Sequence, residues 1–236
     1  MKIKKQLTAL IAASTLVGTL PASAHEGQHM TPEMMLSLAR VGASSLSPDG
    51  KTIVYSVGFP NIKENKIRTE LFSIASNGTG RRQLTQGIAG LHGARWIQQG
   101  RRISSESGEP QVWTMAPDGT DRKQVTRIEG GLSDYLFSPD ETKLAYIKEI
   151  PFGKSTKEVY PDRPKATGRI VTDLMYKHWD EWVETAPHTF VASLAQQPIT
   201  QGKDLLEGEL FEAPMKPHSD ESDIAITPDG KGIAYA

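Results

Sequence analysis

Two stretches of the chain carry residues whose types and spacing point to chemistry. The first is His25-Glu26-Gly27-Gln28-His29, which fits the H-E-x-x-H pattern of zinc proteases. On a helix, two histidines four residues apart bind zinc from one face, while the glutamate acts as a base on the bound water. Gly27 disfavours such a helix, and the residues before His25 predict that it becomes a chain terminus. We therefore expect a polar N-terminus here and no metal site.

The second stretch, YKHWDEWVE, runs from Tyr176 to Glu184 and combines carboxylates with two tryptophans. Asp180 and Glu184 would share a face on a helix, and on a strand they would share one with Trp182 between them. A peptide α-amino group is largely protonated at neutral pH, so a carboxylate is its natural partner. We predict that Asp180, Glu181 and Glu184 hold a cation or a peptide amino terminus. The alternative is that the tryptophans anchor the segment while the acids face water.

Other chemical signals are missing from the sequence. It has no G-x-S-x-G elbow, no cysteine and no glycine-rich phosphate loop. The other histidines lack metal-ligand spacing; they are His92, His178, His188 and His218. The sequence therefore predicts no catalytic residue, no metal site and no cofactor within this chain.

The first 24 residues have the pattern of a secretory signal peptide. Three lysines near the start precede an apolar run over residues 7–20, and Ala22-Ser23-Ala24 is a small-x-small cleavage site. The apolar run is too short to span a membrane, and no second long apolar stretch follows it. We expect cleavage after Ala24, a periplasmic or secreted product, and no membrane association afterwards.

Composition limits the classes of partner. The net charge is -1, and removal of the three lysines of the signal peptide would take it to about -4, so there is no electrostatic case for nucleic acid. Without cysteine, an exported fold has no disulfide and depends on its apolar core alone.

An internal repeat is the main structural signal. Each copy has an apolar residue, a turn related to Pro-Asp-Gly, a polar pair and an apolar strand, and the copies begin at Leu46, Trp96, Phe137 and Ile226. Proline presets one turn angle and glycine supplies a positive φ, so each copy predicts a hairpin. The second copy replaces Pro-Asp by Gln98-Gln99, and the third carries Glu141 in place of glycine.

A second kind of hairpin alternates with the first. The strands at 71–74 and 112–115 lead through Asn-Gly or Asp-Gly turns to short outer strands, and the strand at 190–194 leads to Ile199-Thr200. Two hairpins make a four-stranded unit of roughly 40–50 residues, which is the period of a β-propeller blade. The sequence predicts an all-β fold: an incomplete β-propeller of about three and a half four-stranded blades with a short N-terminal helix.

The remaining segments set the expected domain boundaries. Thr31-Pro32-Glu33 begins the short helix, whose buried face would be Met35, Leu38 and Ala39 and whose end would be Gly42. We expect a signal peptide over 1–24, a tail and helix over 25–43, and a partial propeller over 44–236 with an insertion at about 150–187. Because closed propellers typically have four to eight blades, we expect this sequence to be the front part of a longer protein.

With these motifs in view, the chain resembles the N-terminal part of bacterial dipeptidyl-peptidase V-like serine peptidases, in the prolyl-oligopeptidase family. The motifs that carry the resemblance are "TPE…LSLARVG…LSPDGK", "ATGRIVTDLMYKHWDEWVET" and "EAPMKP", and it runs from about Thr31 to Ala236. The "HWDEW" insertion is the most specific of them, because Ser-Pro-Asp-Gly alone fits many propellers.

The resemblance implies a propeller that gates access to a C-terminal α/β-hydrolase domain with a Ser-Asp-His triad. The substrates would be peptides that lose N-terminal dipeptides, and acidic propeller residues would hold the peptide amine. The triad would lie outside this chain, which would be inactive alone. The rival hypothesis is a stand-alone periplasmic propeller that binds a protein partner, as in the Tol system. It does not predict the insertion. The sequence predicts no oligomeric state.

Overall fold

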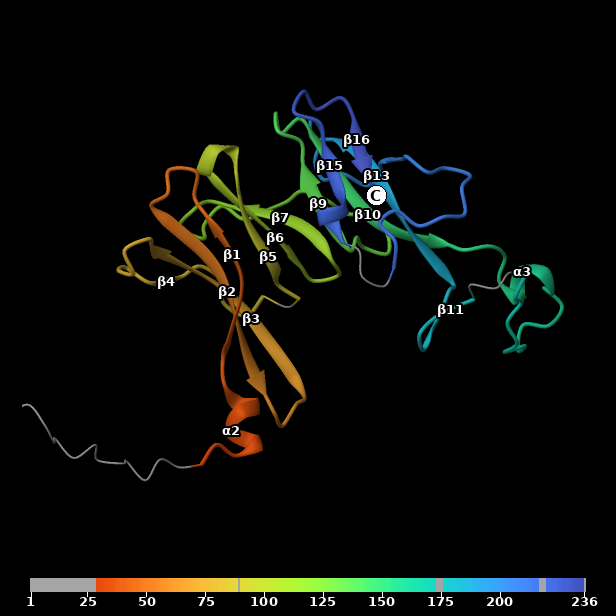
Figure 1. Ribbon diagram of the computed structural model, residues 1–236, viewed down its shortest axis with the longest axis horizontal. Helices are drawn as coiled ribbons and strands as arrows, with labels where there is room; N and C mark the ends of the chain where they lie inside the picture. Colours follow the sequence, from red (N-terminus) through yellow and green to blue (C-terminus); the bar gives the residue numbers. More distant parts are fainter. Residues whose placement is uncertain (1–28, 89, 173–175, 217–219, 236) are drawn as a thin grey trace, which may run out of the picture. The chain divides into compact units, whose positions relative to one another are not determined.

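The computed structural model describes residues 29–88, 90–172, 176–216 and 220–235. These residues form antiparallel sheets with two short α-helices, and Figure 1 shows the sheets following one another along the chain. Contacts divide the chain into a first unit up to Leu38 and a second unit from Ala39 onward. The second unit contains all of the sheets that the structure describes.

Three sheets of the described chain have four strands each, in an order that follows the sequence. The first contains β1 (Arg40–Leu46), β2 (Thr52–Asn61), β3 (Lys66–Ala75) and β4 (Arg82–Gln83). The second contains β5 (His92–Ile97), β6 (Arg102–Ser107), β7 (Gln111–Met115) and β8 (Lys123–Gln124). The third contains β9 (Asp134–Phe137), β10 (Lys143–Pro151), β13 (Thr185–Ser193) and β14 (Lys203–Asp204). A two-stranded sheet of β15 (Ile224–Ile226) and β16 (Ile233–Tyr235) follows, so the predicted incomplete propeller is confirmed.

Local hydrogen bonds explain why the Pro-Asp-Gly copies form hairpins. In the first copy, the Asp49 carboxylate accepts bonds from the Ser47 hydroxyl at 2.6 Å and the Lys51 N–H at 3.1 Å. Asp140 and Asp229 accept equivalent bonds in the third and fourth copies. In all three copies the side-chain hydrogen bond is the main cause that holds the pKa of the aspartate below its ordinary value. The motif is therefore a self-contained turn.

The second copy closes its hairpin without this aspartate. Gln98 and Gln99 both have positive φ, and the Glu141 carboxylate of the next blade accepts a 2.5 Å bond from the Gln98 N–H. The polar Ser104, which departs from the apolar pattern of this strand, accepts a 3.0 Å hydrogen bond from the Tyr135 hydroxyl of the third blade. Contacts with the neighbouring blade thus compensate for the altered residues.

The outer strand of the third blade differs from the prediction. The strand that pairs with β13 is β14, not Ile199-Thr200. Ile199 instead forms a parallel bridge with Thr126 of the second blade, and its side chain is buried in the core. The local pattern resembled that of the other blades, but burial between two blades decided the position of Ile199.

The apolar core lies between successive blades. One cluster joins the first two blades and includes Val54, Leu71 and Ile103. A second cluster joins the second and third blades and includes Tyr135 and Tyr146. The first strands β1 and β5 contact each other, and we call the first strand of each blade its inner strand.

Each of the three four-stranded blades has one buried polar residue at the same place in its third strand. This place lies two residues before the first residue of the third strand that pairs with the outer strand. The residue is Glu70 in the first blade, Gln111 in the second and His188 in the third. Each is buried and bonds to the outer strand or the residues after it. In the first two blades the bond runs through a buried threonine, Thr85 or Thr126, whose hydroxyl also accepts a backbone N–H. We call Glu70, Gln111 and His188 the blade pins.

The N-terminal helix α2 (Pro32–Ser37) begins as predicted, because the Thr31 hydroxyl accepts a 3.2 Å bond from the Met34 N–H. Two details of the prediction are wrong. The helix ends at Ser37 rather than at Gly42, since Leu38 is already extended and β1 starts at Arg40. The expected buried face is exposed: the helix has no buried residue, and Met35, Leu38 and Ala39 all face solvent.

The insertion separates β10 from β13 within the third blade. It contains the short helix α3 (Thr156–Val159) and the hairpin of β11 (Lys177–His178) and β12 (Glu181–Trp182). Ser155 and Glu158 form a capping box that starts α3. None of the helices in the described part of the chain is long and apolar enough to span a membrane.

Candidate functional site

The three predicted carboxylates lie on a tight hairpin of the insertion. β11 and β12 are joined by Trp179 and Asp180, with Trp179 at positive φ, so the segment is neither a helix nor one continuous strand. Asp180 occupies the turn, Glu181 pairs with His178, and Glu184 follows β12. All three acids are exposed. The shared face that a helix or strand would give Asp180 and Glu184 is therefore absent.

Glu184 alone among the three lines a hollow of about 400 Å³ in the insertion. Its carboxylate accepts a 2.7 Å bond from the Arg169 guanidinium, whose central carbon lies 4.5 Å from the Trp182 ring centroid. Trp182 also contacts the Tyr176 ring, 5.9 Å between centroids. The hollow thus presents an aromatic wall beside an ion pair. Trp182 packs within the insertion and does not anchor it to the blades by burial, since it is 40% exposed.

Polar contacts hold the insertion hairpin to another specific motif of the sequence. The His178 ring lies 3.2 Å from the Glu212 carboxylate, and both side chains are largely buried. Lys216 in turn donates a 2.9 Å bond to Glu149 at the end of β10. His178 belongs to "HWDEW", and Glu212 and Lys216 to "EAPMKP". The two motifs are therefore parts of one structure.

A second polar cluster, which the sequence did not predict, joins three blades at their first strands. Arg95 on β5 donates to the Tyr135 carbonyl at 2.6 Å, to Asp134 Oδ1 on β9 at 3.2 Å and to Glu221 Oε1 at 2.5 Å. Glu221 opens the 3-10 helix η2 (Glu221–Asp223), which leads into β15. Glu106 lies on β6 beside these groups. We call Arg95, Glu106, Asp134 and Glu221 the inner-strand cluster.

Burial dominates the electrostatics of the inner-strand cluster. It raises the pKa of Glu106 to about 7 against the opposing charge of Arg95, and Glu221 adds to the rise. Burial also raises the pKa of Asp134 to about 7, helped by a hydrogen bond with the Glu221 carboxyl. The only sequence signal for this cluster is Arg95, a charge where the other copies carry Ser45, Leu136 and Ala225.

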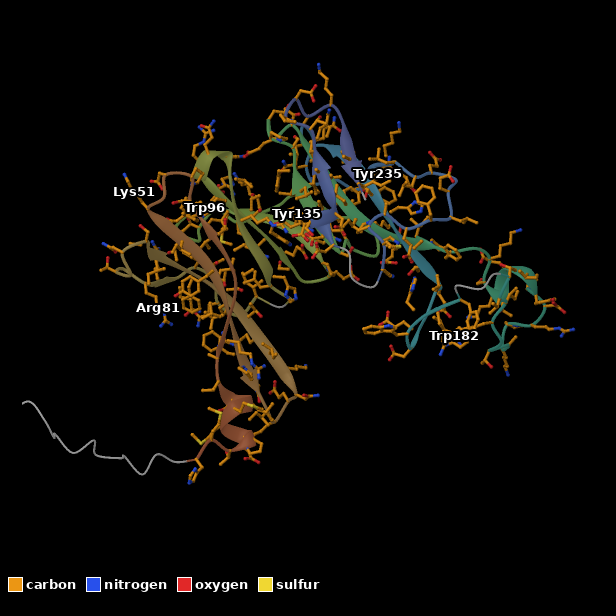
Figure 2. The ribbon with its side chains drawn as sticks, in the orientation of Figure 1. Lys51, Arg81, Trp96, Tyr135, Trp182 and Tyr235 are labelled. Carbon is orange, nitrogen blue, oxygen red and sulfur yellow. The ribbon has the colours of Figure 1, made fainter. Side chains whose placement is uncertain are left out.

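Tyr135 is the apolar neighbour of the inner-strand cluster. Its side chain is buried, its ring lies under Arg95 at 5.1 Å, and burial raises the pKa of its hydroxyl well above the ordinary range. Figure 2 labels Tyr135 among the side chains of the central sheets and Trp182 among those of the insertion.

The part of the chain that the structure describes has no group of three side chains that could together hold a metal ion. Of the H-E-x-x-H stretch only His29 is described; the other four residues lie outside the described residues, as do the signal-peptide pattern and His218.

The chain is 56% identical over 247 aligned residues to dipeptidyl-peptidase 5 of Porphyromonas endodontalis and 50% identical over 240 to that of Porphyromonas gingivalis. Each match covers 99% of this chain but only 36% and 35% of the relative. The chain thus spans about a third of the length of the curated relatives it matches. No protein-family model matches it.

Solved structures support the fold. The acylaminoacyl peptidase of Pyrococcus horikoshii matches 72% of this chain and 25% of its own, with a TM-score of 0.51 at 10% identity. The AtxE2 isopeptidase matches 74% of this chain and 31% of its own, with a TM-score of 0.51 at 17% identity. At such identities the likeness concerns the fold alone.

The fold and the motifs together define the class of protein: the chain is an incomplete β-propeller whose sequence is similar to dipeptidyl-peptidases 5 over almost its whole length. More narrowly, it is homologous to the N-terminal third of the dipeptidyl-peptidases 5. The resemblance seen in the sequence motifs is thereby confirmed for this segment, in preference to the Tol-type hypothesis.

Proposed function

We propose that this chain is the substrate-gating propeller portion of an exported serine dipeptidyl-peptidase. The observation that carries the proposal is its identity of 56% and 50%, over 99% of its length, to two proteins named dipeptidyl-peptidase 5. The catalytic serine, aspartate and histidine are assigned to an α/β-hydrolase part outside this chain. The substrates are peptides with a free amino terminus, from which dipeptides are removed.

Export is part of the same proposal. It rests on the charged start, the apolar run and the small-x-small site of residues 1–24. Placement outside the cytoplasm suits an enzyme that degrades peptides from the surroundings, and a cysteine-free chain needs no oxidant to fold there.

The insertion hairpin is the proposed amine-binding element, with Glu184 as its best-placed residue. Glu184 lines the hollow of the insertion, whereas Asp180 and Glu181 do not. Its carboxylate already accepts from Arg169, and a carboxylate has lone pairs for a further donor. A peptide ammonium group would bind beside this ion pair, against the wall formed by Tyr176 and Trp182.

Replacing Glu184 by alanine in the natural protein is expected to raise KM for dipeptidyl substrates with a free amine by roughly tenfold, which corresponds to about 1.4 kcal/mol of binding. The change removes a charged acceptor while kcat stays near its original value. Steady-state hydrolysis of free and N-acetylated dipeptidyl substrates measures this. Glu207→Gln, a change at an exposed carboxylate, is the matched control.

Asp180→Ala and Glu181→Ala belong in the same series, because both residues are exposed on the hairpin. We expect smaller rises in KM than for Glu184, since neither lines the hollow. An unchanged KM in all three variants would show that the insertion does not bind the amino group of the substrate. Equal cleavage of free and acetylated substrates would argue against dipeptidyl-peptidase activity itself.

A further inference from the structure

Two carboxylates share one nitrogen atom in the inner-strand cluster. Asp134 Oδ1 and Glu221 Oε1 both lie within bonding distance of Nη2 of Arg95, at 3.2 and 2.5 Å. The side chains of Asp134 and Glu221 are only 21% and 26% exposed, so water screens their repulsion poorly. Two half-buried carboxylates this close favour a state in which one of them keeps a proton.

The charges around this pair do not balance. Arg95 supplies one positive charge from β5, while Glu106 on β6 is a further acid facing it. Asp220 lies just before η2, and its carboxylate accepts hydrogen bonds from the Ser222 hydroxyl and N–H. These bonds lower the pKa of Asp220, and the charge of Arg95 contributes in the same direction. The buried Tyr135 hydroxyl stays neutral because its pKa is raised. Full ionisation would therefore place four carboxylates around a single guanidinium.

We propose that the contact of Asp134 and Glu221 with each other and with Arg95 is a pH-sensitive latch between the blades. A proton shared by the Asp134 and Glu221 carboxyls holds η2, and the β15–β16 hairpin that follows it, against β9. Loss of the proton loosens that hairpin. Arg95 binds both carboxyls whether or not they carry the proton, so loss of the proton weakens the contact without breaking it. The proposal concerns the fold of the chain and does not rest on the proposed function.

The direction of the effect follows from the pKa of Asp134, which is raised from 3.8 to about 7 in the docked arrangement. A carboxyl with a raised pKa binds its proton more tightly when docked than when released. The resulting stability is fully present below pH 3.8 and is lost as the pH rises through about 7. Glu106, whose pKa is also raised to about 7, acts in the same direction. The latch is thus closed in mild acid and weakened in mild base.

Hydrogen exchange of the purified protein between pH 5.5 and 8.5, corrected for the intrinsic exchange rate, tests this latch. We expect the protection of residues 221–226 to fall as the pH rises from 5.5 to about 7, by up to tenfold per pH unit for one linked proton, and to level off above about pH 7. Protection of β2 in the first blade serves as the internal reference, and we expect it to stay constant. Protection of 221–226 that is independent of pH in this range would overturn the proposal.

Variants identify the groups responsible. Asp134→Asn has no carboxyl proton to lose, so it should reduce the pH dependence at 221–226 and leave only the part due to Glu106. Glu221→Gln should do the same and serves as the second variant where Asp134→Asn folds poorly. Glu207→Gln, at an exposed acid, should keep the pH dependence of the unaltered protein. If Asp134→Asn and Glu221→Gln both keep the full pH dependence of protection at 221–226, the linked proton lies elsewhere and the proposed latch is contradicted.

Discussion

Replacing Tyr135 by alanine is expected to lower the free energy of unfolding by about 3–5 kcal/mol, the range for large aromatic residues in cores. Tyr135 is 2% exposed and belongs to the core cluster that joins the second and third blades. Its ring meets Phe137 edge-on at 5.8 Å and supports Arg95. Truncation would therefore leave a cavity between two blades and remove a wall of the inner-strand cluster.

Tyr135→Phe separates packing from hydrogen bonding. Phenylalanine keeps the ring but loses the hydroxyl that donates to the fully buried Ser104 at 3.0 Å. The expected cost is about 1 kcal/mol, the typical net value of one hydrogen bond. Urea unfolding followed by tryptophan fluorescence measures both variants. If phenylalanine costs as much as alanine, the hydrogen bond rather than the packing holds these blades together.

Replacing Glu70 by alanine is the second large expected effect, with a loss of about 2–5 kcal/mol of stability, because the buried Thr85 hydroxyl and the partly buried Gly87 N–H lose their acceptor. Glu70 is fully buried, and its carboxylate accepts from the Thr85 hydroxyl and the Gly87 N–H, both at 2.7 Å. It also accepts from Arg68, whose side chain is 54% exposed and can turn to water. The loss therefore comes mainly from Thr85 and Gly87.

The second blade supplies the matched control for Glu70. Gln111 occupies the equivalent position and bonds Thr126 and Ile128 through its side-chain oxygen, at 2.7 and 2.9 Å. Glu70→Gln retains such an oxygen and should cost less than half as much as Glu70→Ala. Thermal unfolding of the two variants side by side measures this. Equal losses for glutamine and alanine would mean that the charge of Glu70, not its role as an acceptor, fastens the blade.

Much of the fold was predictable because its determinants are local. The aspartate of each Pro-Asp-Gly copy accepts hydrogen bonds within its own turn, as Asp49 and Asp229 do. The motif therefore predicts a hairpin from the local sequence alone. The blade count followed from the recurrence of those turns. The outer strand of the third blade was not predictable in this way, because Ile199 is placed by burial against the second blade.

The candidate sites were less accessible to sequence analysis. The carboxylates at 180, 181 and 184 were found by composition, but their arrangement depends on a two-residue turn with Trp179 at positive φ. The inner-strand cluster brings together Arg95, Asp134 and Glu221, which are far apart in sequence and lie in no common motif. The blade pins escaped notice for a different reason. The three residues occupy the same place in their blades and make similar bonds, but they are a glutamate, a glutamine and a histidine. No repeated residue type therefore marks this place in the sequence.

We propose that this chain gates a peptidase whose catalytic groups lie in an α/β-hydrolase part outside it. Hydrolysis of dipeptidyl chromogenic substrates by residues 25–236, compared with the full natural protein at equal concentration, tests it most directly. We predict activity in the natural protein only, and only toward substrates with a free amino terminus. Activity in residues 25–236 would contradict this proposal, because it would require a catalytic nucleophile within this chain.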